Sequence, residues 1–244
     1  MSREYPARLY EAVHVGTPGD KQFYREVCRG SKNVLELGCG TGRIGKVLLR
    51  DGLRVTGIDN DKECVEISEA LGITTHLADI RDFQLNMSFD RIIAPYNVLY
   101  SLLDDDSVVQ CFKKVKLHLQ EYGEFWFDGY SVEALHRSEP IGDNRTETVE
   151  MVATIKVDGT TYDVIERGKW DSSSQLVQAE YRHVPRDRSE VITTEIPQRY
   201  LRTDQIPTLL ERAGLGISKW YGNFNREAPL PESDHVVVCA QRMD

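Results

Sequence analysis

The glycine-rich stretch "LELGCGTGRIG", residues 35–45, constrains the fold more than any other feature of this 244-residue chain. Its first glycine directly follows the apolar run "NVLEL" (33–37), and a strand that enters a glycine loop is typical of nucleotide-binding α/β sheets. Two patterns overlap in it. Read from Gly40, the stretch satisfies G-x-G-x-x-G; read from Glu36, it gives E-x-G-x-G-x-G. The glycine that directly follows the strand decides between the two patterns, and here that glycine is Gly38, two residues before the Gly40 pattern begins.

Residues 31 to about 130 alternate between strand and helix patterns. Strands are expected at 33–37, 53–59, 73–79, 89–95 and 123–130, and helices at 42–52, 61–72 and 104–123. Strands that alternate with helices imply a parallel, doubly wound sheet.

The pattern changes between about residues 147 and 201, where four runs of strand-like residues are separated by short turn sequences. One of these turns is Asp158-Gly159, which is a strong hairpin signal between alternating runs. We therefore expect about four inserted antiparallel strands. A helix at 203–215 and strands at 216–222 and 234–242 then resume the α/β pattern.

Acidic residues end three successive predicted strands, at Glu36, Asp59 and Asp79. Glu36 would repel a pyrophosphate, but it suits a ligand that carries an ammonium and a sulfonium, as S-adenosylmethionine (SAM) does. Asp59 can accept hydrogen bonds from ribose hydroxyls, which would fit NAD equally well. Asp79 can accept from an adenine amino group, and the Ile80 amide can donate to a ring nitrogen. The ordered combination favours SAM.

The motifs "VLELGCGTGR", "VTGIDND", "LADIRDF" and "FDRIIAPYNVLYSL" resemble, in order and spacing, those of class I SAM-dependent methyltransferases. The resemblance implies a doubly wound, seven-stranded, mostly parallel, Rossmann-like sheet whose last strand is antiparallel. The cofactor-binding residues expected on this basis are Tyr10, Tyr24, Glu36, Gly38, Cys39, Gly40, Asp59, Asn60, Asp79, Ile80, Ala94 and Tyr96.

Residues 7–24 and the stretch "APYNVLYSL", with a sheet inserted before the last helix, are similar to small-molecule N-methyltransferases. These include glycine and sarcosine N-methyltransferases, nucleotide-sugar N,N-dimethyltransferases and enzymes that methylate azapteridine-type heterocycles. The resemblance implies N-terminal lid helices (1–30), a SAM-binding domain (31–138 and 201–244) and an inserted sheet (139–200). It further implies that the insertion covers the acceptor site and often builds a homodimer.

Residues that follow the fourth strand are expected at the carboxyl edge of the sheet, where ligands bind in α/β folds. The predicted substrate-binding residues are Asn97, Tyr100, Tyr130, Trp170 and Tyr200. The predicted catalytic residues are Tyr10, His14 and Tyr96, with His14 as the histidine to test as a proton acceptor. His118, His136, His183 and His235 are expected to be solvated.

The composition disfavours two classes of partner, nucleic acids and membranes. The net charge of −9 and the lack of a basic cluster disfavour nucleic acid, and no apolar run is long enough for a membrane span. Five dispersed cysteines argue against disulfides and structural zinc, and for a reducing, cytoplasmic location. "APYN" stands where base-methylating enzymes carry Asn/Asp-Pro-Pro-Tyr/Phe, and no metal-binding acidic set is evident.

The sequence therefore predicts a SAM-dependent N-methyltransferase that acts on a small metabolite and uses no metal. An O-methyltransferase is the alternative that the residues leave open. More remote alternatives are a dinucleotide-dependent oxidoreductase that uses the Gly40 pattern and a non-catalytic SAM-binding protein.

Overall fold

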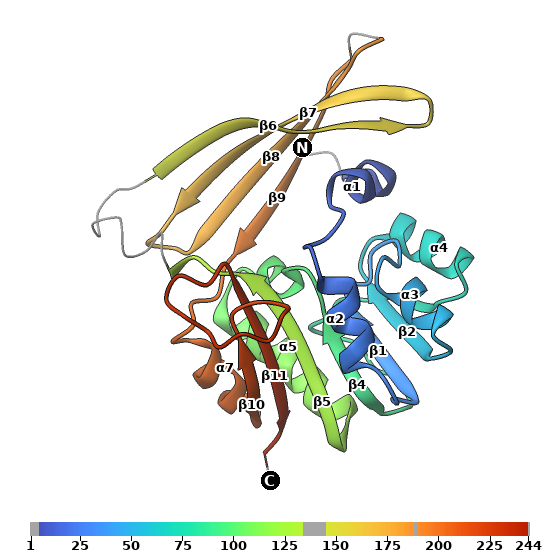
Figure 1. Cartoon of the computed structure of the whole chain (residues 1–244), viewed down its shortest axis with the longest axis vertical. Coiled ribbons are helices and arrows are strands. Elements are labelled where there is room, and N and C mark those ends of the chain that lie inside the picture. The colour runs from blue at the N-terminus through green and yellow to red at the C-terminus, as the bar shows by residue number, and fades with distance from the viewer. Residues whose placement is uncertain (1–4, 134–144, 188–189, 244) are drawn as a thin grey trace. The chain divides into compact units, whose positions relative to one another are not determined.

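The computed structural model describes residues 5–133, 145–187 and 190–243 and divides the chain into two compact units (Figure 1). The smaller unit combines Met1–Val15 with Leu135–Tyr200, and the larger unit combines Gly16–Ala134 with Leu201–Asp244. The segment expected to form a lid, 1–30, is thus shared. Helix α1 (Ala7–Val13) belongs to the smaller unit, and helix α2 (Asp20–Val27) belongs to the larger one.

The larger unit contains a sheet of seven strands among the described residues, in the order β10-β11-β5-β4-β1-β2-β3. Its strands are β1 (Asn33–Leu37), β2 (Arg54–Asp59), β3 (Thr74–Leu77), β4 (Phe89–Ala94), β5 (Leu119–Tyr130), β10 (Leu215–Tyr221) and β11 (His235–Arg242). Strands β1 to β5 pair in parallel, whereas β11 pairs antiparallel with both β5 and β10. The predicted mostly parallel, seven-stranded fold is confirmed.

Helices lie over both faces of this sheet; Figure 1 shows α2 in front of it and α5 behind it. The helices are α2, α3 (Gly45–Arg50), α4 (Lys62–Ala70), the 3₁₀ turn η1 (Val98–Ser101), α5 (Asp105–His118) and α7 (Ile206–Arg212). Phe23, Ile44 and Leu48 of the α2 and α3 region share one buried core with residues of β1, β5 and β11. These apolar side chains therefore pack against the sheet.

Local capping fixes two of the helix starts. The Asp61 carboxylate accepts a hydrogen bond from the Cys64 amide (2.9 Å) at α4, and the Asp104 carboxylate accepts one from the Ser107 amide (2.7 Å) at α5. Helix α5 ends at His118, five residues before the expected end. The buried His118 ring bonds the Lys114 carbonyl and the Leu85 amide, so the expectation that His118 is solvated is wrong.

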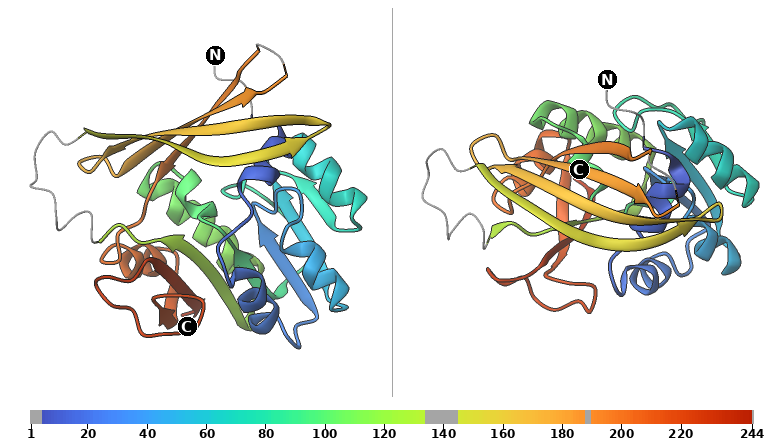
Figure 2. Two further views of the ribbon diagram at one scale, coloured as in Figure 1. Left: turned by 45° about the horizontal axis from the view of Figure 1, so that its top comes forward. Right: turned by 90° about the horizontal axis from the view of Figure 1, so that it is seen from above.

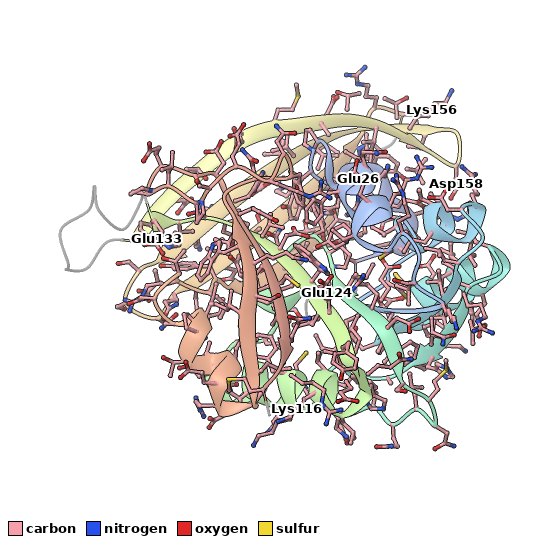
Figure 3. All side chains as sticks on the ribbon, turned by 60° about the horizontal axis from the view of Figure 1, so that its bottom comes forward. Glu26, Lys116, Glu124, Glu133, Lys156 and Asp158 are labelled. Atoms are coloured by element: carbon pink, nitrogen blue, oxygen red, sulfur yellow. The ribbon has the colours of Figure 1, made fainter. Side chains whose placement is uncertain are left out.

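The smaller unit contains a four-stranded antiparallel meander among its described residues, in the order β6-β7-β8-β9 (Figure 2). Its strands are β6 (Arg145–Val157), β7 (Thr160–Asp171), β8 (Leu176–Pro185) and β9 (Ile192–Arg199). Asp158 and Gly159 form the β6–β7 turn with φ of 48° and 85°, the positive values that a tight two-residue hairpin turn requires. Figure 3 labels Asp158 at this turn. The predicted inserted antiparallel sheet is confirmed.

Helix α1 packs against this sheet through Leu9, which shares a buried cluster with Ile155, Val164 and Tyr181. Because α1 buries its apolar face on the insertion, the two segments form one unit although about 120 residues separate them in sequence. Within the described residues, no helix is long and apolar enough to cross a membrane.

Candidate active site

The glycine loop after β1 turns on three residues with left-handed backbone angles, Gly38 (φ 59°), Gly40 (φ 54°) and Gly42 (φ 85°). Gly38 directly follows β1, and a Cβ there would overlap the Val98 side chain. At Gly40, by contrast, a Cβ would meet no atom within 4 Å. The Gly40 backbone therefore faces open space, as close approach to a ligand requires.

Asp59, the last residue of β2, holds this loop in place. Its Oδ2 accepts a hydrogen bond from the Gly40 amide (2.7 Å), and its Oδ1 accepts one from the Asp61 amide (2.9 Å). Burial raises the pKa of the Asp59 carboxyl, against the backbone donors that lower it. A carboxylate fixed in this way presents its remaining lone pairs in a defined direction, which suits the recognition of ribose hydroxyls.

A cavity of about 420 Å³ opens at the carboxyl ends of β1, β2 and β3. We call it the strand-end cavity. Five of the predicted cofactor-binding residues line it: Gly38, Asp59, Asn60, Asp79 and Ile80. The opposite wall comes from the segment after β4, which includes Val98 and Ser101 to Asp104. The structure thus brings together residues that the sequence places after three different strands.

Arg81 also lines the strand-end cavity, and sequence reasoning did not identify it. Its guanidinium makes a two-pronged ion pair with Asp79, with distances from 2.6 to 3.1 Å. The hydrogen bonds from Arg81 hold the pKa of the Asp79 carboxyl below its usual range. Asp79 is therefore an ionised acceptor, as the adenine role expected for it requires.

Three other predicted cofactor residues are buried and are not among the described residues that line the cavity: Glu36, Cys39 and Ala94. Burial raises the pKa of the Glu36 carboxyl to about 8, although the Arg43 guanidinium and the Gly45 amide lower it. Cys39 packs toward Gly57 of β2, where an added Cβ would lie 2.6 Å from its sulfur. These three residues therefore belong to the protein interior next to the site.

Arg43, which sequence reasoning missed, lies where the sheet order reverses between β1 and β4. Its guanidinium forms an ion pair with Asp20 of α2 (2.6 Å) and lies 5.2 Å from the centre of the Tyr96 ring. Both members of the ion pair are largely buried. The contact between Arg43 and Tyr96 joins the segments that follow β1 and β4, and this switch point is where open α/β sheets bind ligands.

Asp128 at the end of β5 is a second residue that sequence reasoning missed. Its carboxylate accepts hydrogen bonds from the Tyr24 hydroxyl (2.5 Å) and from the Tyr96 amide (3.0 and 3.1 Å). Burial raises the pKa of Asp128 to about 6, despite these donors. Tyr24 itself is fully buried, and burial next to Asp128 raises the pKa of its hydroxyl.

Tyr96 and Asn97 both adopt left-handed backbone angles, with φ of 61° and 62°. Such angles are unfavourable for a tyrosine and persist where the surroundings enforce them. Here the Asn97 Oδ1 accepts from the Tyr130 amide (2.8 Å), and the Tyr100 hydroxyl donates to the Tyr130 carbonyl (2.8 Å). Hydrogen bonds among the predicted residues Asn97, Tyr100 and Tyr130 therefore connect the segment after β4 with the end of β5. The Tyr100 side chain is buried.

The remaining predicted residues lie in the smaller unit. Tyr10 and His14 stack at 4.2 Å between ring centres, and His14 lies 5.0 Å from Tyr181. Burial and, to a smaller extent, the neighbouring His183 lower the pKa of His14 to about 4, so its ring is neutral at pH 7. His183 is fully buried and contacts the Tyr5 hydroxyl (3.1 Å), so the expectation that it is solvated is wrong.

Trp170 and Tyr200 are also in the smaller unit, both buried, with ring centres 6.3 Å apart. The Gln175 side chain donates to the Tyr200 carbonyl (2.9 Å), which ties the end of β9 to the β7–β8 turn. Both rings are packed within the sheet of this unit.

Residues 34–123 match the family model described as a methyltransferase domain. A protein of Geobacillus sp. (strain WCH70) that is named a methyltransferase is 33% identical over 240 residues, which cover 91% of this chain and 88% of that protein. The chain belongs to the methyltransferase family. The expected methyltransferase activity is thereby confirmed.

Solved structures of methyltransferases share the fold. The CcbJ methyltransferase from Streptomyces caelestis superposes with a TM-score of 0.78 at 19% identity, covering 93% of this chain and 97% of that one. The sugar N-methyltransferase KedS8 from Streptoalloteichus sp. ATCC 53650 superposes with a TM-score of 0.73 at 15% identity, covering 100% and 94%.

The residues of this methyltransferase fit SAM. The open backbone at Gly40, the fixed Asp59 carboxylate and the ionised Asp79 offer the contacts that an adenosine needs, and all three lie at one sheet edge. Within the described residues, no group of three or more His, Cys, Asp and Glu side chains could hold a metal ion.

Proposed function

We propose that this methyltransferase transfers the methyl group of SAM to a nitrogen atom of a small metabolite, an amine or a nitrogen heterocycle. The observation that carries the SAM site is the convergence of Gly38, Asp59, Asn60, Asp79 and Ile80 on the strand-end cavity. Bound SAM supplies an electrophilic methyl group on a sulfonium. Asp59 binds the ribose, Asp79 and the Ile80 amide bind the adenine, and Tyr96 lies on the side from which an acceptor approaches.

The protonation states support nitrogen over oxygen as the acceptor atom. An amine that binds in its neutral form attacks through its own lone pair, whereas a hydroxyl must lose its proton to a base. His14, the histidine predicted as a proton acceptor, has a pKa of about 4 and is a weak base. Asp128 near the switch point already accepts hydrogen bonds from Tyr24 and Tyr96. These groups favour an acceptor that needs no strong base.

The fold neighbours are consistent with a small acceptor, since one of them is a sugar N-methyltransferase. The net charge of −9 also disfavours nucleic acid, because phosphate binding depends on clustered lysines and arginines. Positioning alone can contribute roughly 7–11 kcal/mol to a displacement of this kind, so alignment of acceptor, methyl and sulfur is the main task of the site.

Calorimetric titration of SAM and S-adenosylhomocysteine into the wild-type enzyme tests the cofactor, with NADH as the control ligand. We expect micromolar binding of both sulfur ligands, loss of binding in Asp59→Ala and no binding of NADH. Binding of NADH alone would contradict the proposal and favour the Gly40 pattern.

The acceptor atom is tested with pairs of compounds that differ only in an amine or a hydroxyl at one position, starting with amino sugars and their hydroxy counterparts. Mass spectrometry should find a methylated product with the amine of a pair and none with the alcohol. Methylation of the alcohol alone would establish the O-methyltransferase alternative.

A further inference from the structure

Three buried carboxylates from three elements lie around the guanidinium of Arg43: Asp20 of α2, Glu36 of β1 and Asp128 of β5. Their exposed fractions are 3%, 2% and 4%. We call these four residues the switch-point cluster. Three acids next to one cation leave the cluster with excess negative charge whenever the acids are ionised.

The excess charge falls on Asp128. Asp20 pairs directly with Arg43 at 2.6 Å. Glu36, with a pKa of about 8, holds its proton at pH 7. Asp128, with a pKa of about 6, is mostly ionised at pH 7, and its own contacts are hydrogen bonds from Tyr24 and Tyr96. Its negative charge is therefore held by neutral hydrogen-bond donors, and the nearby Arg43 guanidinium, which also lowers its pKa, is paired directly with Asp20.

Asp128 is bonded to the segment that follows β4, and Val98 and Ser101 to Asp104 of that segment line the strand-end cavity. Ligands in open α/β sheets bind across the switch point, which lies here between β1 and β4, so a ligand longer than adenosine is expected to extend along this segment toward Tyr96. Tyr96, whose amide binds Asp128 and whose ring faces Arg43, belongs to the segment that this extension meets. The part of SAM beyond the adenosine carries the sulfonium, and its product S-adenosylhomocysteine carries a neutral thioether in the same place.

We propose that Asp128 is a specificity-determining residue of this site, whose buried carboxylate favours the cationic SAM over its neutral product, S-adenosylhomocysteine. This inference rests on the proposed function. When the methyl group moves, a bond forms between its carbon and the acceptor nitrogen while the C–S bond breaks and the sulfur keeps the electron pair. The positive charge passes from the sulfur to the methylated nitrogen, which leaves with the acceptor or loses a proton to water. The sulfur of S-adenosylhomocysteine is therefore no longer attracted to Asp128, which promotes release of this product.

The test compares four ligands by calorimetry. SAM carries the sulfonium, and sinefungin carries an ammonium in its place; S-adenosylhomocysteine and 5′-methylthioadenosine are neutral at this position. In Asp128→Asn, we expect the affinity for SAM and sinefungin to fall about tenfold, the size expected for the loss of one nearby charge at low dielectric. The affinities for the two thioethers should stay within about twofold, since the asparagine oxygen still accepts from Tyr24 and Tyr96.

Asp90→Asn is the matched control. Asp90 lies near the start of β4, at the opposite edge of the same sheet, where its carboxylate accepts from the Lys32 and Asn33 amides. The substitution changes the net charge by the same amount, and the ratio of SAM to S-adenosylhomocysteine affinity should match that of the wild type. An unchanged ratio in Asp128→Asn, or an equal loss for all four ligands, would overturn the proposal and leave Asp128 a structural role.

A titration of the wild type between pH 7.0 and 5.0 gives the same answer without a variant. The groups that face Asp128 are Tyr24 and Asp20 of α2, Arg43, Tyr100 and the Tyr96 amide. Protonation of Asp128 on acidification should reduce the preference for SAM. A preference that is constant over this range would contradict the proposal. Failure of every ligand to bind the wild type would instead refute the proposed function.

Discussion

The strand-end cavity and the switch-point cluster lie at the carboxyl edge of the same sheet. They differ in the distance along the chain between the residues that bond to one another. In the cavity, Asp79 is bound by Arg81, two residues away, and Asp59 is bound by Asp61 and by Gly40 of the preceding loop. In the cluster, Asp128 bonds the Tyr24 hydroxyl across 104 residues and the Tyr96 amide across 32. The cavity is thus built from local motifs, and the cluster is built by the tertiary fold.

The pKa shifts of the acidic side chains also differ between the two regions. In the cavity, Arg81 lowers the pKa of Asp79, whereas burial raises that of Asp59 against its backbone donors. The acids of the cluster are desolvated, and burial raises the pKa of Glu36 to about 8 and that of Asp128 to about 6. Perturbed pKa values of this kind gather at functional sites. We therefore propose that the cavity binds the neutral adenosine and that the cluster responds to charge.

The largest effect is expected from Asp59→Ala. The substitution leaves the Gly40 and Asp61 amides without their acceptor and removes the ribose contact, so the loop loses the geometry that binds adenosine. We expect the binding of SAM, S-adenosylhomocysteine and 5′-methylthioadenosine to weaken alike, by about 30- to 150-fold for two to three kcal/mol of lost contacts. Calorimetry measures this. Selective loss of SAM would break the distinction between the two regions.

Next in size is the effect of Arg43→Met on stability. The substitution leaves Asp20 buried beside Glu36 and Asp128 without the cation that all three share. Removal of one partner of a buried ion pair typically costs about 3–5 kcal/mol. Urea unfolding should show a loss of that order, and the double variant Arg43→Met with Asp20→Asn should recover part of it. Full wild-type stability in the single variant would refute the cluster as a coupled unit.

Asp128→Asn should make the enzyme more stable at pH 8 while it weakens SAM binding. The folded-state pKa of Asp128, about 6, lies above its usual value of 3.8, so its ionisation destabilises the fold as pH rises through 6. The stability difference between variant and wild type should be near zero at pH 4 and reach about 1–3 kcal/mol at pH 8. Thermal unfolding of both proteins at the two pH values measures it. A difference that does not change with pH would contradict the raised pKa.

The smallest effect is expected from Arg81→Ala. The Arg81 side chain is 45% exposed, and ion pairs at this exposure contribute between 0 and about 1 kcal/mol. The affinity for SAM should fall by no more than about threefold, with an equal change for S-adenosylhomocysteine, because the cavity does not sense the charge at sulfur. A larger and selective loss of SAM would show that charge recognition extends into the cavity.

The separation along the chain between bonded residues explains which parts of the site were predictable from the sequence. Gly38, Asp59 and Asp79 each follow a strand whose pattern is visible in the sequence, and parallel strands bring such positions to one edge. In the cluster, Glu36 was predicted from the glycine pattern, and Arg43, which was missed, also had a local signal as a cation directly after the glycine loop. Asp128 had none, since its role depends on a hydroxyl that α2 supplies from 104 residues away.

Burial was the least predictable property. Glu36, Tyr24 and Tyr100 were expected to contact ligands, and all three are buried, with Tyr24 and Tyr100 bonded to Asp128 and Tyr130. His118 and His183 were expected in solvent, and each is enclosed by packing that no local pattern reveals. The two sheets were predictable because their periodicities are local, and the grouping of α1 with the inserted sheet was not, because it depends on Leu9 packing against distant strands.

A crystal structure of the enzyme with S-adenosylhomocysteine would show directly where the cofactor binds. We expect the adenosine in the strand-end cavity, with ribose oxygens within hydrogen-bond distance of Asp59, the adenine amine near Asp79, and the sulfur toward Tyr96. A ligand whose adenosine lies outside this cavity, or whose sulfur points away from β4, would contradict both the site and the role of the switch-point cluster.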